Sequence, residues 1–193
     1  MTTLKTKQLE VWEGRFGEEY TDRAVVDVGA RKGTFEQLLI SVPAPVETIL
    51  EVGCGKGDNL TALKELGYEI SGVEPLHYAL VRALEKGHRV FPGNCFSVPF
   101  ADDEFDLTLT AGVLMHVIPE DMTRAIQELW RVTKRFLLII EYYASEETSI
   151  IYRGHEDLLW KRDYSIWAKN LIKTGQLDKA SGFDNCTYWL FQK

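Results

Sequence analysis

A chain of 193 residues can form one domain with a real core, but it is too short for two comfortable ones. Its 29 acidic and 22 basic residues leave a net charge of −7, which argues against broad binding to the phosphate backbone of a nucleic acid. The longest apolar run is too short for a membrane span, the N-terminus lacks the apolar core of a signal peptide, and the three cysteines show no metal-ligand spacing, so we expect a cytoplasmic protein without a metal.

The first forty residues are predicted to be mainly helical and to end at Pro43-Ala44-Pro45. Short β-branched or apolar runs then alternate with segments whose leucines recur at helical spacing. The predicted strands are 48–52, 69–73, 88–91, 105–110, 136–142 and 187–191. The predicted helices are 60–66, 76–84, 119–130 and 155–173. This alternation predicts an α/β fold with a doubly wound, mostly parallel sheet.

The first predicted strand ends in a loop with glycines at alternate positions, Gly53, Gly55 and Gly57. Glycine lets the backbone turn tightly and approach a bound nucleoside closely, at the strand ends where doubly wound sheets bind ligands. A dinucleotide fingerprint has its third glycine one residue later, where Asp58 would face a pyrophosphate. S-adenosylmethionine carries no phosphate, so the loop favours this cofactor.

A second acid, Glu74, ends the next predicted strand, and its carboxylate oxygens suit the hydroxyls of a ribose. Each feature alone has an ordinary explanation, because glycine-rich turns are common and a glutamate at a strand end is usually solvated. Glu51, the loop and Glu74 together, in register with strand, helix and strand, predict a cofactor site. Cys54 is expected to be a small turn residue.

The run ILEVGCGKGDN at 49–59 resembles motif I of the class I S-adenosylmethionine-dependent methyltransferases. The stretch 93–106 resembles the third-strand loop of that superfamily, which lies along the adenine, and 110–117 resembles the segment that lines the methionine part and the reaction centre. The resemblance implies a seven-stranded Rossmann-like sheet. The cofactor contacts expected from the motifs and strand ends are Glu51, Gly53, Gly55, Gly57, Asn59, Glu74, Pro75, Asn94, Cys95, Phe96, Ala111 and Gly112.

A narrower resemblance spans nearly the whole chain. The segments 12–23, 112–121 and 141–164 and the terminal YWLFQK are similar to the pseudaminic acid biosynthesis-associated methylases. This similarity implies a bacterial or phage enzyme that methylates a small molecule or glycan precursor, for example a sugar acid. The stretch 173–185 is shorter than the sixth-strand region of that family, so we expect this region to be shortened and its antiparallel strand pair to be affected.

Because the sulfonium is already a strong methyl donor, the protein has mainly to align the acceptor and exclude water. His116, just past the fourth predicted strand, is the candidate general base and a substrate contact; packing against the cofactor and capping the Pro119 helix are the alternatives. Tyr142 and Tyr143 follow the fifth predicted strand, where alternation should point one of them into the pocket. We predict both as substrate contacts and Tyr143 as a catalytic residue.

Cationic residues concentrate after the fifth predicted strand, at Arg153, His155, Lys161 and Arg162. They could hold a carboxylate or phosphate of the acceptor; the alternative is that Lys161 and Arg162 form a solvated helix face, and for Lys161 this alternative is favoured. Arg153 lies beside Gly154 in a predicted loop and is the expected substrate contact. The predicted reaction is therefore direct in-line transfer to a small, anionic acceptor, with oxygen favoured as the methylated atom.

Near the N-terminus, Trp12, Phe16, Tyr20 and Arg23 share one helical face. Core packing explains Trp12 and Phe16, whereas the polar ends of Tyr20 and Arg23 could close over the cofactor and meet its carboxylate. We predict a single methyltransferase domain, in which residues 1–45 form a helical cap over the cofactor site and 46–193 form the core.

The chain lacks two motifs of enzymes that methylate nucleic-acid bases, an Asp/Asn-Pro-Pro-aromatic tetrad and a Pro-Cys nucleophile. We therefore expect no nucleic-acid or membrane partner, and a monomer or homodimer. Two alternatives stay open: a non-catalytic module that binds the cofactor as a sensor or partner subunit, and a nicotinamide oxidoreductase, which Asp58 disfavours.

Overall fold

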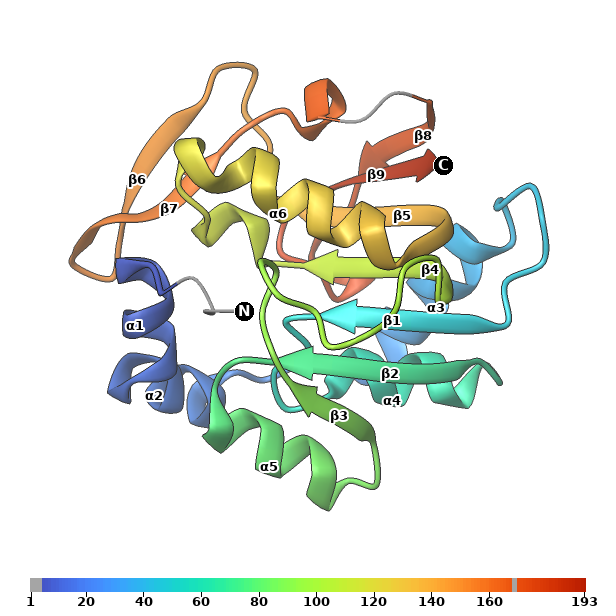
Figure 1. The fold of residues 1–193 in the computed structure, drawn as a ribbon, viewed down its shortest axis with the longest axis horizontal. Helices are drawn as coiled ribbons and strands as arrows, with labels where there is room; N and C mark the ends of the chain where they lie inside the picture. The colour runs from blue at the N-terminus through green and yellow to red at the C-terminus, as the bar shows by residue number, and fades with distance from the viewer. Residues whose placement is uncertain (1–4, 168–169) are drawn as a thin grey trace.

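The computed structural model describes residues 5–167 and 170–193 and is built on a twisted central sheet (Figure 1). The seven strands of this sheet lie in the order β3-β2-β1-β4-β5-β9-β8. All pairs from β3 to β5 are parallel, and β9 is antiparallel to both of its neighbours. The strands are β1 (Thr48–Val52), β2 (Glu69–Glu74), β3 (Arg89–Pro92), β4 (Phe105–Ala111), β5 (Thr133–Glu141), β8 (Leu171–Gln176) and β9 (Thr187–Gln192). The predicted doubly wound, mostly parallel, seven-stranded sheet is confirmed.

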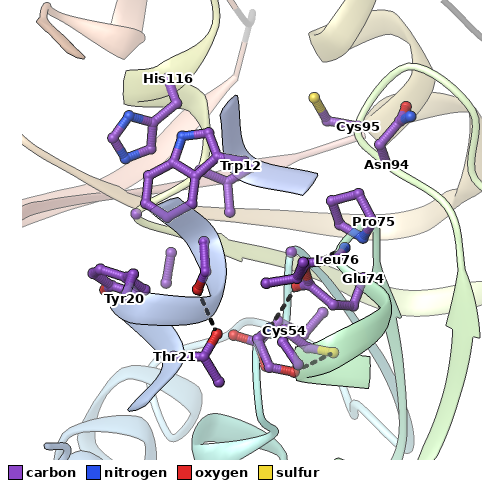
Figure 2. A pocket seen from close by; sticks show the side chains of 18 of the residues that line it. Trp12, Tyr20, Thr21, Cys54, Glu74, Pro75, Leu76, Asn94, Cys95 and His116 are labelled. Atoms are coloured by element: carbon purple, nitrogen blue, oxygen red, sulfur yellow. Dashed lines mark hydrogen bonds between the residues drawn. The ribbon is translucent and has the colours of Figure 1, made fainter. Parts of the chain in front are cut away.

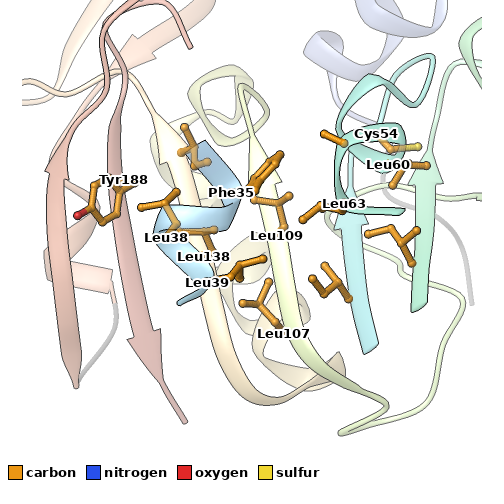
Figure 3. Close-up of a cluster of buried hydrophobic side chains, with 14 of the residues drawn as sticks. Phe35, Leu38, Leu39, Cys54, Leu60, Leu63, Leu107, Leu109, Leu138 and Tyr188 are labelled. Carbon is orange, nitrogen blue, oxygen red and sulfur yellow. The ribbon is translucent and has the colours of Figure 1, made fainter. Parts of the chain in front are cut away.

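Both faces of the sheet are buried, which explains why β5 is apolar along almost its whole length. Phe136, Leu138 and Ile140 enter the core on one face, shown in Figure 3, and Leu137 and Ile139 enter the core on the other. The helices α3 (Val28–Leu39), α4 (Asp58–Glu65) and α5 (His77–Glu85) cover the first face, and α6 (Pro119–Val132) covers the second. As predicted, Pro119 begins α6, where its missing N–H leaves no hydrogen bond unmade.

Two short helices lie beyond the carboxyl ends of the parallel strands, α1 (Lys7–Glu13) and α2 (Arg15–Arg23) (Figure 1). The side-chain oxygen of Thr6 caps α1 by accepting a hydrogen bond from the Leu9 amide at 3.1 Å. The extended backbone of Gly14 separates the two helices. The division into a cap of residues 1–45 and a core of 46–193 stays a prediction, although α3 packs with the sheet.

The helix predicted over 155–173 is wrong. The chain forms an antiparallel hairpin there, β6 (Thr148–Tyr152) and β7 (His155–Lys161), followed by a single 3-10 turn, η2 (Tyr164–Trp167), and by β8. Arg153 and Gly154 form the hairpin turn with φ values of +51° and +85°, a left-handed conformation that suits a two-residue turn. Residues 168–169 of the predicted helix lie outside the described residues.

The antiparallel pair at the sheet edge is complete, so the effect expected from the short stretch 173–185 is not seen. The strands β8 and β9 have six residues each and are paired from Leu171↔Phe191 to Gln176↔Thr187. The short η3 (Lys179–Ser181) bridges them, so any shortening falls in the connection. None of the helices within residues 5–167 and 170–193 is long and apolar enough to cross a membrane.

Candidate functional site

A cavity lies at the carboxyl ends of β1 and β4, which are neighbours in the sheet (Figure 2). After β1 the chain continues into α4 on one face, and after β4 it continues through η1 (Leu114–His116) into α6 on the other. The connections diverge at this point of the strand order, which leaves the crevice that doubly wound sheets use for ligands. The helices α1 and α2 form the opposite wall of the cavity.

The glycine loop has two positions that face the cavity and one that does not. Gly53 and Gly55 line the cavity, with φ values of +80° and +53°. A Cβ on Gly53 would lie 2.3 Å from a Val113 methyl, whereas a Cβ on Gly55 would meet nothing within 4 Å. Gly57, at φ +79°, instead faces the His88 ring, which a Cβ would approach to 2.8 Å. The loop therefore presents open backbone to the cavity at Gly55.

Glu51 is the most buried acid in the cavity wall. Its Oε1 accepts a hydrogen bond from Asn59 Nδ2 at 2.5 Å, while its Oε2 is buried without a partner in the described part of the chain. Burial raises the pKa of Glu51 to about 7, against the lowering effects of the Asn59 hydrogen bond and of Arg31. The unpaired oxygen leaves this wall able to accept a hydrogen bond from a bound molecule.

Arg31, on α3, also lines the cavity and was missed in the sequence. Its guanidinium donates to Asn59 Oδ1 at 2.6 Å and to the Gly182 carbonyl at 3.1 Å, and lies 4.5 Å from the centroid of the Phe183 ring. These contacts hold one cation beside the Glu51 carboxyl. No local sequence pattern indicates this role, because Asn59 is 28 residues further along the chain.

Glu74, at the end of β2, is the predicted ribose contact and lines the cavity. Its Oε2 accepts from the Gly55 amide at 2.7 Å and its Oε1 accepts from the Leu76 amide at 2.9 Å. Each carboxylate oxygen has a second lone pair, so both can still accept from a ligand. Burial raises the pKa of Glu74 to about 7, against the lowering effect of these two hydrogen bonds.

The predicted adenine segment forms another part of the wall, with Asn94, Cys95 and Phe96 all lining the cavity. Asn94 Oδ1 accepts from the Phe96 amide at 2.9 Å, which fixes the turn. Burial raises the pKa of the Cys95 thiol to about 12, so the thiol stays protonated. The remaining predicted cofactor residues that line the cavity are Tyr20, Asn59, Pro75, Ala111 and Gly112.

His116 lines the cavity at the end of η1, with its ring centroid 4.5 Å from that of Trp12. Its Nδ1 lies 2.5 Å from the Leu158 carbonyl oxygen. Because a carbonyl can only accept, Nδ1 must carry the proton and Nε2 is left with a free lone pair. Burial lowers the pKa of His116 to about 4, so the ring is neutral near pH 7. A neutral imidazole with a free Nε2 is able to accept a proton.

The segment that carries His116 is held by Glu141, another residue that we did not single out in the sequence. This fully buried carboxyl at the end of β5 accepts from the amides of Val113 and Leu114 at 2.8 Å each and from the Met115 amide at 3.3 Å. In the sequence, Glu141 is an acid at the end of a predicted apolar strand, as Glu74 is, and this pattern could have identified it.

Lys56, in the glycine loop, connects this loop to α2. Its Nζ donates to the carbonyl oxygens of Thr21 and Ala24 at 3.1 and 2.5 Å. Lysine satisfies carbonyls that a helix leaves unpaired at its C-terminal end. The glycine loop and the helix that carries Tyr20 are therefore joined directly.

Several predicted site residues do not line the cavity. Tyr142 lies with its hydroxyl 3.3 Å from Asp184, and Tyr143 is 45% exposed. Arg153 lies in the hairpin turn, and Arg23 packs over the rings of Phe16 and Tyr20. Gly57 is turned toward His88. The two tyrosines miss the cavity because β5 ends at Glu141, whose side chain reaches the η1 segment instead.

Two other expectations need correction. Arg162 is not on a solvated face: it is 2% exposed, and its guanidinium donates twice to the Val117 carbonyl at 3.1 Å, beside Glu147 at 3.0 Å. Trp12 was assigned to core packing, but it lines the cavity. Figure 2 shows Trp12 beside His116, on the side of the pocket opposite Glu74 and Pro75.

Comparison with known proteins matches this site to one enzyme class. A profile of the methyltransferase domain family matches residues 50–136. A protein of Staphylococcus carnosus described as an uncharacterized methyltransferase is 28% identical over 172 residues, which cover 80% of this chain and 76% of that protein.

Solved structures agree in fold. The 1,6-didemethyltoxoflavin-N1-methyltransferase of Burkholderia thailandensis, with 1,6-didemethyltoxoflavin and S-adenosylhomocysteine bound, superposes with a TM-score of 0.75 at 15% identity, over 100% of this chain and 92% of that one. A SAM-dependent methyltransferase of Methanosarcina mazei superposes with a TM-score of 0.68 at 19% identity, over 81% and 96% of the two chains.

The matched residues 50–136 run from β1 into β5 and include the glycine loop, Glu74, the turn at Asn94 and the His116 segment. The fold and the matched domain point to the same activity, and the chain is an S-adenosylmethionine-dependent methyltransferase.

Proposed function

We propose that the enzyme transfers the methyl group to a small molecule held in the cavity, by direct in-line attack of an acceptor oxygen or nitrogen, with oxygen favoured. The observation that carries this proposal is the unpaired, fully buried Oε2 of Glu51 in a cavity that also contains Glu74 and the open position at Gly55. An unpaired buried carboxylate oxygen is costly unless a ligand satisfies it.

The residues of the cavity fit the cofactor from end to end. Glu51 would accept from its amino group, and Arg31, which lines the same wall, would pair with its carboxylate. Glu74 would accept from the ribose hydroxyls, and the turn from Asn94 to Phe96 would lie along the adenine. Tyr20 would close the site from α2, in the position that the sequence suggested.

Bound S-adenosylmethionine supplies an electrophilic methyl group on a sulfonium. The tasks of this chain are then to orient the acceptor, exclude water and remove a proton. The free Nε2 of His116 is the group in the cavity wall best prepared to take that proton, because Nδ1 is fixed by the Leu158 carbonyl. A neutral base of this kind contributes about 10²–10⁴-fold when the acceptor proton must leave.

The small-molecule assignment is supported by the largely apolar cavity and by the toxoflavin precursor bound in the Burkholderia enzyme. The narrower resemblance suggests a sugar acid or glycan precursor, and this stays a prediction. Incubation with radiolabelled cofactor and a panel of sugar acids, nucleotide sugars and hydroxylated heteroaromatics tests both suggestions. The absence of labelled product across the panel would contradict a small-molecule acceptor.

Cofactor binding is tested separately by calorimetry with S-adenosylhomocysteine. Glu74→Ala should weaken binding about 10- to 100-fold, because it removes two charge-assisted acceptors. The matched control is Glu69→Ala, which changes an exposed acid at the other end of the same strand. Unchanged affinity in Glu74→Ala would remove the ribose assignment.

A further inference from the structure

The acceptor must approach from the side of the cavity opposite the residues proposed for ribose and adenine. We call this side the acceptor end and define it by Leu9, Trp12, Val113, His116 and Val117, which all line the cavity. Figure 2 shows two of them, Trp12 and His116, side by side and away from Glu74, Pro75 and Asn94. Leu9 packs against the core cluster that contains Val117. The acceptor end is therefore built from apolar and aromatic side chains.

None of the described residues that line the acceptor end carries a positive charge. The two cations in that lining are Arg31 and Lys56. Arg31 bonds to Asn59 and Gly182 and is the residue proposed to pair with the cofactor carboxylate, and Lys56 donates to two carbonyls of α2. An anionic acceptor would enter an apolar space without a free counterion, and transfer of an unpaired charge from water into such a space is strongly unfavourable.

The five side chains that define the acceptor end offer one hydrogen-bond donor and one acceptor, both on rings. Thr6 and Gln8, which also line the cavity, bond instead to the Leu9 amide and the Asp157 carbonyl. Trp12 Nε1 is buried and has no partner among the described residues. His116 Nε2 carries a lone pair because Nδ1 is committed to the Leu158 carbonyl, and no hydrogen bond to Nε2 is made within the described part of the chain. A bound molecule can satisfy both groups if it presents an acceptor atom and an O–H or N–H.

We infer that the methyl acceptor is an uncharged, planar molecule, an aromatic or heteroaromatic ring that bears the O–H or N–H to be methylated. This inference rests on the proposed function. Such a ring would pack on the apolar side chains and face the indole of Trp12, while its O–H or N–H donates to His116 Nε2. The anionic acceptor expected from the sequence lacks this support, since Arg153 lies outside the cavity lining.

The step balances with groups already in the cavity. The acceptor heteroatom forms a bond to the methyl carbon as the carbon–sulfur bond breaks, and the electron pair of that bond stays on sulfur as a neutral thioether. The acceptor proton passes to His116 Nε2, and the imidazolium then returns it to water. No oxidant, reductant or metal is needed.

The test uses two probes that differ by one carboxylate, naphthol and hydroxynaphthoate, added to the full chain saturated with S-adenosylhomocysteine. Binding is measured by calorimetry. We expect naphthol to bind at least about tenfold more tightly than hydroxynaphthoate, because only the carboxylate must be desolvated without a partner. Trp12→Phe keeps an aromatic ring and removes the N–H, and it should weaken naphthol binding about 3- to 10-fold.

Phe91→Leu, at an aromatic residue outside the cavity lining, serves as the control and should leave both affinities unchanged. Equal or tighter binding of hydroxynaphthoate, or no binding of naphthol by protein that still binds S-adenosylhomocysteine, would overturn the inference. Failure to bind S-adenosylhomocysteine at all would instead count against the proposed cofactor site, so the two failures are distinguishable.

Discussion

A single carboxyl group, that of Glu51, combines complete burial with an oxygen that no described residue satisfies. Burial raises its pKa to about 7, so a large fraction of the free protein holds it protonated at pH 6. The amino group of a bound cofactor would favour the ionised form, because an opposite charge close to a carboxyl lowers its pKa. Ligand binding and proton loss should therefore be coupled at this residue.

Ligand binding should release a proton from Glu51. Binding of S-adenosylhomocysteine at pH 6 should release up to about one proton, measured by calorimetry in buffers of different ionisation enthalpy. Glu51→Gln should abolish most of this release and weaken binding, whereas Glu65→Gln, on the exposed surface of α4, should change neither. A proton count that is the same in the wild type and in Glu51→Gln would contradict the role given to Glu51.

The two cavity-facing glycines should respond differently to alanine. Gly53→Ala places a methyl 2.3 Å from Val113 and should destabilise the fold by more than the roughly 1 kcal/mol expected from strained backbone alone. The methyl group of Gly55→Ala would meet no protein atom within 4 Å, so this variant should unfold only slightly below the wild-type temperature. The methyl group would enter the cavity, so the variant should lose affinity for S-adenosylhomocysteine. Thermal melts and calorimetry on both variants check this contrast, and it fails if Gly55→Ala binds normally.

His116 should matter for turnover and much less for cofactor affinity. His116→Phe keeps a ring and removes the base, so kcat should fall about 10²–10⁴-fold while the affinity for S-adenosylhomocysteine stays near that of the wild type. Because the pKa of His116 is lowered to about 4, this group should cause no loss of rate between pH 6 and 8. Steady-state rates of the wild type and His116→Phe, compared with calorimetry of S-adenosylhomocysteine binding, distinguish a base, whose loss lowers kcat alone, from a residue that packs against the cofactor.

The segment 113–117, which connects β4 to α6, is held from two sides. Glu141 accepts from three of its amides, and Arg162 donates to the Val117 carbonyl. Both groups are buried, so loss of either leaves unpaired polar atoms. The placement of His116 therefore depends on residues from β5 and from the chain just after β7.

Glu141→Gln should lower the free energy of unfolding by about 1–3 kcal/mol, since one acceptor oxygen is replaced by a donor that faces an amide. It should also reduce kcat, because the His116 segment loses its support. Glu146→Gln, an exposed acid in the loop that follows β5, is the matched control. Urea unfolding with activity measurement checks both effects, and a fully stable Glu141→Gln variant would contradict this account.

The parallel strands were predictable because strands buried on both faces read as apolar runs, and their connecting helices show leucines at helical spacing. The hairpin was missed because Leu158, Leu159 and Trp160 form a short apolar run that suits either a strand or a helix. The signal that decides between them is the turn at Arg153 and Gly154, where both residues have positive φ values.

The site was predictable where it lies on strand ends, since consecutive parallel strands end at the same edge of the sheet. Glu51, Glu74 and His116 were found in this way, and all three line the cavity. Arg31 and Trp12 were not assigned a role, because their places depend on contacts with residues far away in the chain, Asn59 and His116. Such pairings arise from packing and leave no local pattern.

Three buried carboxyls affect the stability of the folded protein in the same direction. Burial raises the pKa values of Glu51, Glu74 and Glu141 from 4.5 to about 7 in the folded protein. Between these values the folded state binds more protons than the unfolded state, so their contribution to stability falls as pH rises. His116, whose pKa is lowered from 6.5 to about 4, opposes this trend only below about pH 6.5.

The protein without ligand should therefore become less stable as pH rises from 6.5 to 8. Thermal melts across this range check the direction. Glu74→Gln, which cannot ionise, should show a weaker dependence on pH than the wild type. A melting temperature that rises with pH in this window would contradict burial as the dominant influence on these carboxyls.

The hairpin of β6 and β7 pairs only within itself among the described strands and lies outside the matched residues 50–136. It borders the cavity at His116, through the Leu158 carbonyl and the Tyr152 ring, whose centroid lies 5.6 Å from that of His116. It also touches α1 through a hydrogen bond from Gln8 to the Asp157 carbonyl. Because no described strand of the central sheet pairs with this hairpin, the hairpin and α1 could be exchanged together between related enzymes without breaking the sheet. Chimaeras in which 148–161 and α1 are exchanged should still bind the cofactor and should acquire the acceptor preference of the parent that supplied these segments.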